Sequence, residues 1–141
     1  MFEVKVVSND FEMEQVLSIR KTVFVEEQLV SIDIEIDEFE NTATHFLLLK
    51  NKKPIGASRT REVDGYIKME RVCILQNERK EGAGAFLMKF MHDYCKEKGY
   101  IKSKLNSQKH AEPFYKKLGY ETVSDEFLDA GIPHVTMIKN L

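Results

Sequence analysis

The sequence has no tryptophan, only two cysteines and three prolines among its 141 residues, and no apolar run long enough to cross a membrane. Because Cys73 and Cys95 both lie inside apolar segments, we expect buried, reduced thiols and not a disulfide framework. Residues 1–6 alternate apolar and polar side chains as a strand does, so they lack the apolar core of a signal peptide. Together these absences predict a cytoplasmic protein that binds no membrane.

A strong net charge is also missing, since the formal charge is −2 at pH 7. No basic face interleaved with aromatic residues is evident, so we expect no binding to nucleic acid. The length, with 43% hydrophobic and 31% charged residues, is typical of one globular domain covering residues 1–141. No internal repeat, low-complexity segment or linker divides it.

The negative charge is concentrated in residues 26–40, which hold seven acidic residues and no lysine or arginine. Without counter-charges, this acidic stretch should attract a cationic acceptor such as an amine; the alternative is a solvated acidic face. A metal site is a weaker third possibility, because no ligand spacing of a known type appears. Such a site would be built from Asp33, Glu35, Asp37 and His45.

Hydrophobic periodicity predicts a mixed α/β sheet with the element order β-α-β-β-β-α-β-α-β-β. Strands are expected near residues 2–6, 45–49, 55–63, 66–75, 100–105, 120–123 and 134–138, and helices near 10–28, 82–98 and 108–118. The acidic stretch to Asn41 reads as a loop or short irregular turn, and the segment between the last two strands as a polar loop. Pro113 suggests that the regular part of helix 108–118 starts only shortly before it. Asp64-Gly65 is a strong hairpin signal, and Gly99 and Gly119 are placed to end the last two helices. Strand 100–105 follows a helix and should lie parallel to strand 66–75.

One strand, turn and helix stand out between residues 72 and 98. The apolar strand 72–75 runs into a polar turn, and apolar residues then recur at helical spacing: Ala83, Phe86, Leu87, Phe90, Met91, Tyr94 and Cys95. Unpaired N–H groups at such a helix start can bind phosphate, and Gly82 and Gly84 carry no Cβ to keep a pyrophosphate away. The alternative is an ordinary helix start beside a surface pair, Arg79 and Lys80. The third glycine of a dinucleotide fingerprint and the Gly-Lys-Ser/Thr of a P-loop are both missing.

The pattern Arg79-x-x-Gly82-x-Gly84 between a strand and an amphipathic helix resembles the acyl-CoA-binding motif of the GNAT (Gcn5-related N-acetyltransferase) superfamily. The predicted element order matches the GNAT fold from end to end. The segment 114–120, Phe-Tyr-Lys-Lys-Leu-Gly-Tyr, resembles the superfamily's late helix-to-strand signature. Three further segments resemble a bacterial branch, the ElaA/YjcF-like acetyltransferases: Val25-Glu26-Glu27-Gln28, Glu70-Arg71-Val72 and Gly131-Ile132-Pro133-His134.

This resemblance implies acetyl-CoA as cosubstrate and a set of residues that contact it. The turn and the helix start would supply N–H donors to the pyrophosphate. The strand before them would expose its backbone to the pantetheine arm, where it splays from its parallel neighbour. A bulge in that strand would free an N–H group to polarise the thioester carbonyl. The implied CoA-binding residues are Val72, Cys73, Ile74, Arg79, Lys80, Glu81, Gly82, Ala83, Gly84, Ala85 and Gln108.

Acetyl transfer to an amine needs a base for the incoming ammonium and is helped by an acid for the departing thiolate. Tyr115 aligns with the tyrosine that acts as general acid in many GNAT enzymes; the alternative is a core aromatic residue. For the base, Glu70 is slightly favoured, against a plain salt bridge at that position or a base acting through water. His134 and Glu26 are candidates for contacts with the acceptor, and His134 also for the base. Their alternatives are a partly buried strand histidine and a surface charge at a helix end.

We therefore expect an acyl-CoA-dependent N-acyltransferase that passes acetyl directly to a primary amine of a small molecule or peptide. A covalent route through Cys73 would need a paired histidine, and none is evident nearby. The rival hypothesis is a non-catalytic module that binds CoA or regulates another process. The prediction includes no metal, and includes a homodimer only by analogy with the superfamily.

Overall fold

The computed structural model describes residues 1–141 and contains one mixed sheet with the strand order β1-β2-β3-β4-β5-β8-β6, to which β7 is added by pairing with β8. The strands are β1 (Phe2–Val6), β2 (Thr44–Lys50), β3 (Lys53–Val63), β4 (Tyr66–Ile74), β5 (Lys102–Gln108), β6 (Glu121–Thr122), β7 (Phe127–Asp129) and β8 (Ile132–Asn140). The helices are α1 (Asp10–Arg20), α2 (Ile32–Glu35), α3 (Ala83–Glu97) and α4 (Glu112–Lys117), with a π-helical segment η1 (Lys21–Glu27) and two 3₁₀ turns, η2 (Gln76–Glu78) and η3 (Lys109–Ala111). The predicted mixed α/β sheet is confirmed.

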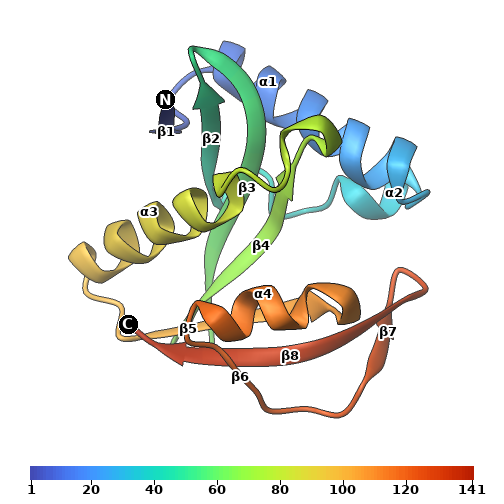
Figure 1. Cartoon of the computed structure of the whole chain (residues 1–141), viewed down its shortest axis with the longest axis vertical. Helices are drawn as coiled ribbons and strands as arrows, with labels where there is room; N and C mark the ends of the chain where they lie inside the picture. The colour runs from blue at the N-terminus through green and yellow to red at the C-terminus, as the bar shows by residue number, and fades with distance from the viewer.

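Helices cover both faces of this sheet, with α1 on one side and α3 on the other (Figure 1). In β2, Leu47 and Leu49 pack with Val16 of α1, whereas Phe46 and Leu48 belong to the larger cluster around α3. Alternate side chains of β2 therefore point into two different hydrophobic clusters. This explains why the strand reads as an uninterrupted apolar run in the sequence.

The turn signals of the sequence are confirmed. Asp64 and Gly65, between β3 and β4, have φ values of 52° and 82°, as a two-residue type I′ hairpin requires. Gly99 and Gly119 follow α3 and α4 with φ values of 96° and 97°, a left-handed conformation that ends a helix at low cost for glycine.

Three local expectations were wrong. The acidic stretch is not all loop, because Ser31 caps the short helix α2 by accepting a hydrogen bond from the Asp33 N–H. The segment before β8 contains a further strand, β7. This strand is too short, and its neighbours too polar, to give a recognisable strand pattern in the sequence. Gln108 is the last residue of β5 and not the start of a helix. The regular helix α4 begins at Glu112, just before Pro113, as the proline indicated.

The two parallel strands β4 and β5 separate part-way along their length. They pair only from Ile67 to Met69, opposite Ser103 to Leu105, as predicted for a parallel pair. Beyond that point β4 contains a bulge: Ala57 of β3 pairs with Cys73, but Arg59 pairs with Glu70, so β4 has one residue more than β3 over this interval. The fold thus creates an opening between β4 and β5 in the middle of the sheet.

Candidate active site

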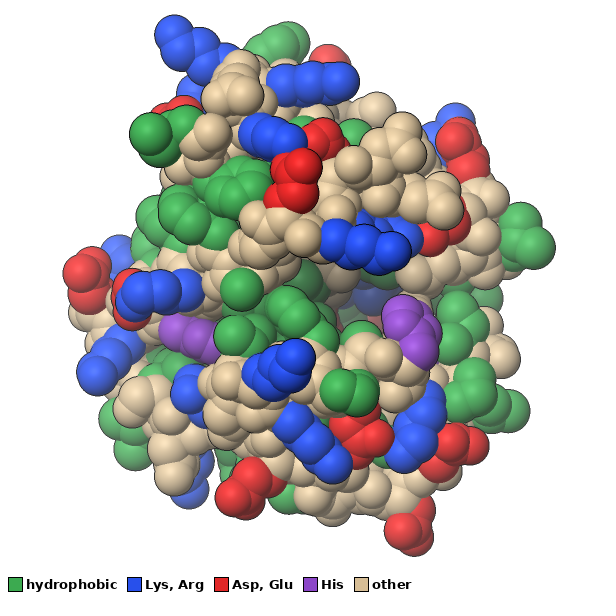
Figure 2. Space-filling view, in the orientation of Figure 1, with side chains coloured by type: hydrophobic (Ala, Val, Ile, Leu, Met, Phe, Trp, Pro, Cys, Tyr) green, Lys and Arg blue, Asp and Glu red, His purple; other side chains and the backbone are tan.

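The opening between β4 and β5 is a cavity of about 860 Å³. Its wall is formed by β4 from Lys68 onwards, the start of α3, the end of β5, α4, η1 with the residues after it, α2, the end of β7 and the start of β8. Figure 2 shows the surface hollowed near the centre of the view, with lysine and arginine side chains on the rim. All the predicted site residues line this cavity except Glu81 and Glu26.

One end of the cavity is the N-terminus of α3. Gly82 caps this helix with φ 82° and no side chain accepts a bond from it; the first bond of the helix runs from the Phe86 N–H to the Gly82 carbonyl. The N–H groups of Ala83, Gly84 and Ala85 are therefore left without acceptors. All three residues line the cavity together with Lys80 and Gly82. Unpaired donors at the positive end of a helix dipole form a site for an anion.

Gly84 is required for packing as well as for access. A Cβ at this position would lie 3.1 Å from Cζ of Phe114 on α4, which is tighter than ordinary van der Waals contact. Gly82 has open space around it, and its requirement is the left-handed backbone. The two glycines of the motif therefore serve two different purposes, one conformational and one steric.

The side chains of Arg79 and Glu81 are held by other parts of the protein. Arg79 donates from Nε to the Ile74 carbonyl (2.9 Å) and from its two terminal nitrogens to the Glu27 carboxylate (2.7 and 2.8 Å). Glu81 pairs with Lys50 and does not line the cavity. Arg79 thus joins the end of β4 to η1 and fixes the turn, while the helix amides remain the free donors.

The middle of the cavity lies along β4 after the bulge. Val72, Cys73 and Ile74 line it, and β5 offers them no partner, since the parallel pairing ends at Met69. The bulge that the family resemblance implied is confirmed, with Arg71 in a left-handed conformation (φ 54°) just before Val72. An unpaired strand edge can bind the amide groups of an extended ligand.

Cys73 is buried, and burial raises the pKa of its thiol to about 12. A thiol with such a pKa stays protonated at neutral pH, and the thiolate is the nucleophilic form. The environment of Cys73 therefore opposes a covalent acetyl-enzyme.

Tyr115 projects from α4 and is half-buried against Phe114 and Tyr120, with ring centroids 5.0 and 5.9 Å away. It lines the cavity and its hydroxyl makes no hydrogen bond within the protein. Burial and the neighbouring Cys73 raise the pKa of Tyr115 above its ordinary value. The residue is thus both part of the aromatic packing and a protonated phenol facing the cavity.

Gln108 lies at the end of β5 and crosses the cavity towards η1. Its Nε2 donates to Oε1 of Gln28 (2.7 Å), and its Oε1 is 2.7 Å from Nε2 of His110. All three residues line the cavity. Gln28 had no assigned role in the sequence, although it ends one of the segments that resemble the bacterial branch.

Glu70 is held in the salt-bridge arrangement considered as its alternative. Its Oε1 accepts from Nε of Arg59 (3.0 Å) and Nε of Arg61 (2.9 Å), and its Oε2 is 3.2 Å from Lys68 Nζ. Burial alone would raise the pKa of Glu70, but Arg61, Arg59 and Lys68 lower it below its ordinary value. A carboxylate so stabilised in its charged form is a weak base.

His134, on β8, presents a free ring nitrogen to the cavity. Its Nδ1 is 2.7 Å from the Ile132 carbonyl oxygen, which can only accept, so Nδ1 carries the proton and Nε2 has the lone pair in the neutral ring. The ring of Phe127 on β7 is stacked with the His134 ring, with their centroids 6.1 Å apart. Glu26, by contrast, is exposed outside the cavity.

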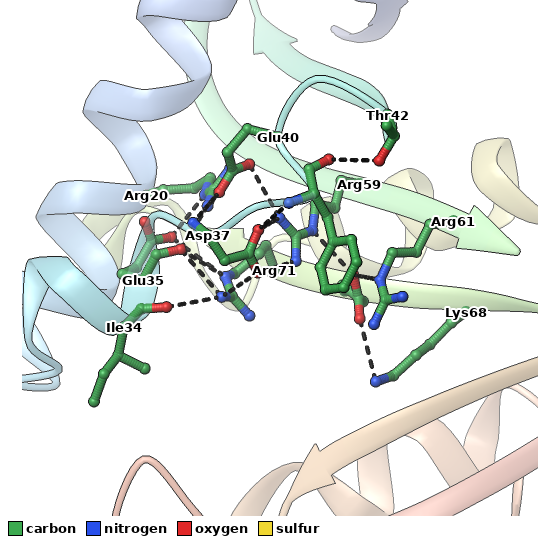
Figure 3. Close-up of polar contacts among 12 residues, drawn as sticks. Arg20, Ile34, Glu35, Asp37, Glu40, Thr42, Arg59, Arg61, Lys68 and Arg71 are labelled. Atoms are coloured by element: carbon green, nitrogen blue, oxygen red, sulfur yellow. Dashed lines mark hydrogen bonds and ion pairs between the residues drawn. The ribbon is translucent and has the colours of Figure 1, made fainter. Parts of the chain in front are cut away.

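The acidic stretch is not without counter-charges, contrary to the expectation from its local sequence. Arg20 donates to Glu35 (2.7 Å) and Glu40 (2.7 Å), and Arg59 pairs with Asp37 (2.7 Å) (Figure 3). These arginines come from α1 and β3, far away in the sequence. Glu35 and Asp37 bind guanidinium groups, and the structure contains no group of His, Cys, Asp or Glu side chains arranged to hold a metal ion.

Comparison with known proteins decides the family. The sequence profile of the acetyltransferase (GNAT) domain matches residues 7–141. The chain belongs to the GNAT acetyltransferase family. Among curated proteins it is 43% identical to an uncharacterized N-acetyltransferase, YjcF of Bacillus subtilis, over 96% of this chain and 97% of that protein.

Two solved GNAT-fold proteins superimpose over almost the whole chain. The crystal structure of Escherichia coli ElaA matches with a TM-score of 0.88 and 25% identity, covering 99% of each chain. A GNAT family acetyltransferase from Elizabethkingia anophelis, solved with acetyl-CoA bound, matches with a TM-score of 0.76 at 13% identity, covering 99% of this chain and 98% of that one; this likeness shows the fold. The resemblance to the ElaA/YjcF-like branch and the acetyltransferase assignment are confirmed. None of the helices combines the length and the apolar character that a membrane crossing requires.

Proposed function

We propose that this GNAT acetyltransferase binds acetyl-CoA in the cavity between β4 and β5 and transfers the acetyl group to a primary amine. The observation that carries the proposal is the row of free N–H groups at Ala83, Gly84 and Ala85, continuous with the unpaired edge of β4. A pyrophosphate on the helix amides places the pantetheine arm along residues 72–74. The thioester then reaches the bulge, and a backbone N–H there stabilises the oxyanion.

Two side chains carry the proton transfers. His134 Nε2 takes a proton from the ammonium, and the free amine nitrogen forms a bond to the thioester carbonyl carbon. As the carbon–sulfur bond breaks, the Tyr115 hydroxyl protonates the departing thiolate. Tyr115 suits this role because its raised pKa keeps it protonated, and its hydroxyl has no partner in the protein. The nitrogen of the adduct still carries one proton more than the product amide, and this proton returns to the Tyr115 phenolate. His134 then releases the first proton to solvent, so that an ammonium and acetyl-CoA give an amide, the CoA thiol and one proton.

His134 replaces Glu70 as the favoured base. Glu70 already accepts from three cationic side chains, which leaves its carboxylate little tendency to take a proton. The His134 tautomer leaves a lone pair on the nitrogen that is free to face the amine. Glu70 is then a positioning residue, because it holds Lys68 and the two arginines beside the bulge.

The direct test combines calorimetry with a screen. Acetyl-CoA should bind with a stoichiometry of one per chain, and an amine library read by release of free thiol should find turnover. Tyr115→Phe should bind acetyl-CoA as the unmodified protein does but lose most turnover. Tight CoA binding with no turnover on any amine would instead favour a CoA-binding or regulatory module, and absence of CoA binding would overturn the proposal.

A further inference from the structure

The end of the cavity along β4 up to the bulge, from Lys68 to Arg71, holds cationic side chains with unused hydrogen-bond donors. In the proposed function this end faces the acceptor. An ion-pair cluster lies behind its wall (Figure 3). Its carboxylates are Glu35, Asp37, Glu40 and Glu70, and its cations are Arg20, Arg59, Arg61, Arg71 and Lys68. Within the cluster the cations outnumber the carboxylates by one, and a further carboxylate, that of Asp129 on β7, lines the cavity outside the cluster.

Arg71 is a cation of this cluster that lines the cavity and has an unused donor. Its Nε and Nη2 donate to the Glu35 carbonyl (3.3 and 3.1 Å), and Nη2 is also 3.3 Å from Asp37 Oδ2. Its Nη1 makes no hydrogen bond or ion pair. Figure 3 shows one nitrogen of this guanidinium pointing away from the carboxylates. The side chain is 25% exposed and lines the cavity.

Lys68 lies on the same strand and lines the same end of the cavity. Its single ion-pair partner is Glu70 Oε2 at 3.2 Å, and Glu70 is shared with Arg59 and Arg61. A lysine ammonium has three donors, so two are left for other partners. Lys68 and Arg71 therefore offer unused N–H groups on either side of Glu70.

The carboxylates of the cluster are not available to a ligand in the same way. Asp37 and Glu40 each bind two arginine side chains. Glu35 has one oxygen without a partner, Oε2, but this atom is sealed from solvent. Burial and, after it, the neighbouring Arg59 and Arg20 lower the pKa of Arg71.

We propose that the acceptor of this enzyme is an amine that also carries an anionic group, either a carboxylate or a phosphate, which binds between Arg71 Nη1 and Lys68 Nζ. This inference rests on the proposed transferase function and specifies its substrate class. It reverses the expectation drawn from the acidic stretch, because the tertiary structure uses those carboxylates to hold arginines. The amine group of the acceptor then points along the cavity towards His134 on the opposite wall.

The test is a panel of matched amines assayed for thiol release with acetyl-CoA. Each amine is supplied in three forms: with a free carboxylate, with a phosphate, and with the carboxylate blocked as an amide or methyl ester. We expect kcat/KM for one anionic form to exceed that of the neutral form by about tenfold to a hundredfold, the range of one charged hydrogen-bonded contact. The form that is preferred distinguishes a carboxylate from a phosphate.

Variants link that preference to the two side chains. Arg71→Gln and Lys68→Gln should each reduce the ratio of anionic to neutral kcat/KM by about tenfold, while acetyl-CoA affinity stays unchanged. Arg61→Gln is the matched control: it removes another cation that binds Glu70 and has similar exposure (22%), but it does not line this cavity. Because the readout is a ratio, a general loss of folded enzyme cancels out.

Three results would overturn the inference. Equal kcat/KM for charged and neutral amines would remove the anionic acceptor but leave the transferase function standing. A preference that survives in both Arg71→Gln and Lys68→Gln would place the anion elsewhere. Acetyl-CoA binding without turnover of any amine would remove the inference together with the proposed function.

Discussion

Gln108 at the end of β5 donates through Nε2 to Oε1 of Gln28, a residue 80 positions earlier in the chain, at 2.7 Å. The bond crosses the cavity and ties the segment after η1 to the opposite strand. It is a direct side-chain connection between two walls of the cavity.

This bond leads to a first prediction. Gln108→Ala and Gln28→Ala should each weaken acetyl-CoA binding by up to about tenfold, because loss of one hydrogen bond costs about 0.5–1.5 kcal/mol. The double variant should bind acetyl-CoA almost as well as either single variant, since each single substitution already removes the same hydrogen bond. Calorimetric titration of the three proteins measures this. Fully additive losses would contradict the coupling of the two residues through their mutual bond.

The two glycines with φ 82° allow a matched comparison. Gly82→Ala and Gly65→Ala both place a Cβ on a left-handed residue with open space around it, so each should destabilise the fold by about 1–2 kcal/mol in urea unfolding. Only Gly82 borders the free amides of α3, so only Gly82→Ala should also weaken acetyl-CoA binding. Equal acetyl-CoA affinity of both variants would argue against a phosphate site at this helix start.

Replacement of Tyr115 by phenylalanine should lower kcat by about 10²–10⁴-fold, the usual contribution of a general acid. The raised pKa of Tyr115 sets the direction of the pH dependence. Tyr115 can act as an acid only while it is protonated. The activity should therefore be lost only above the ordinary tyrosine range near pH 10. A pH–rate profile whose alkaline limb lies well below that range, and persists in Tyr115→Phe, would assign the limb to another group.

The two candidate bases should respond differently to amide replacement. His134→Gln should lower kcat by about 10²–10⁴-fold with little change in stability or acetyl-CoA affinity. Glu70→Gln should instead destabilise the fold by about 3 kcal/mol, because it leaves Arg59, which is 1% exposed, with one carboxylate fewer. Steady-state kinetics with urea unfolding separates the two. A larger kcat loss in Glu70→Gln than in His134→Gln would restore Glu70 as the base.

The ion-pair cluster should make the protein sensitive to acid. The arginines lower the pKa of Asp37, and Arg20 and Arg61 lead the groups that lower those of Glu40 and Glu70. Because these pKa values are lower in the folded than in the unfolded protein, the unfolded chain takes up protons first. The stability is fully present above the unfolded values near pH 4 and is lost as the pH falls towards the folded ones. Thermal unfolding between pH 6 and 2 should show this fall, and Asp37→Asn should make it shallower.

Local sequence determined much of this protein. The turn at Asp64-Gly65, the helix ends at Gly99 and Gly119 and the two-sided apolar strand β2 all follow from backbone preferences and periodicity, which act over a few residues. The motif around Gly82 and Gly84 follows in the same way, because free amides at a helix start depend only on the turn before it. The strands expected at residues 2–6 and 66–75 correspond to β1 and β4 for the same reason.

Tertiary structure decided what the charged residues do. Glu35, Asp37 and Glu40 stand in a stretch without a single basic residue, yet Arg20 and Arg59 reach them from other elements. Their partners could not be read from the sequence, because charges interact through space and over distances set by the packing of α1, β3 and α2. The same holds for Arg71, which lies in the bulge of β4 and contacts Glu35 and Asp37, and for Lys68, which shares Glu70 with two arginines of β3. The sequence thus determined the family and the proposed place of acetyl-CoA, and packing determined which charges are left with free donors in the cavity.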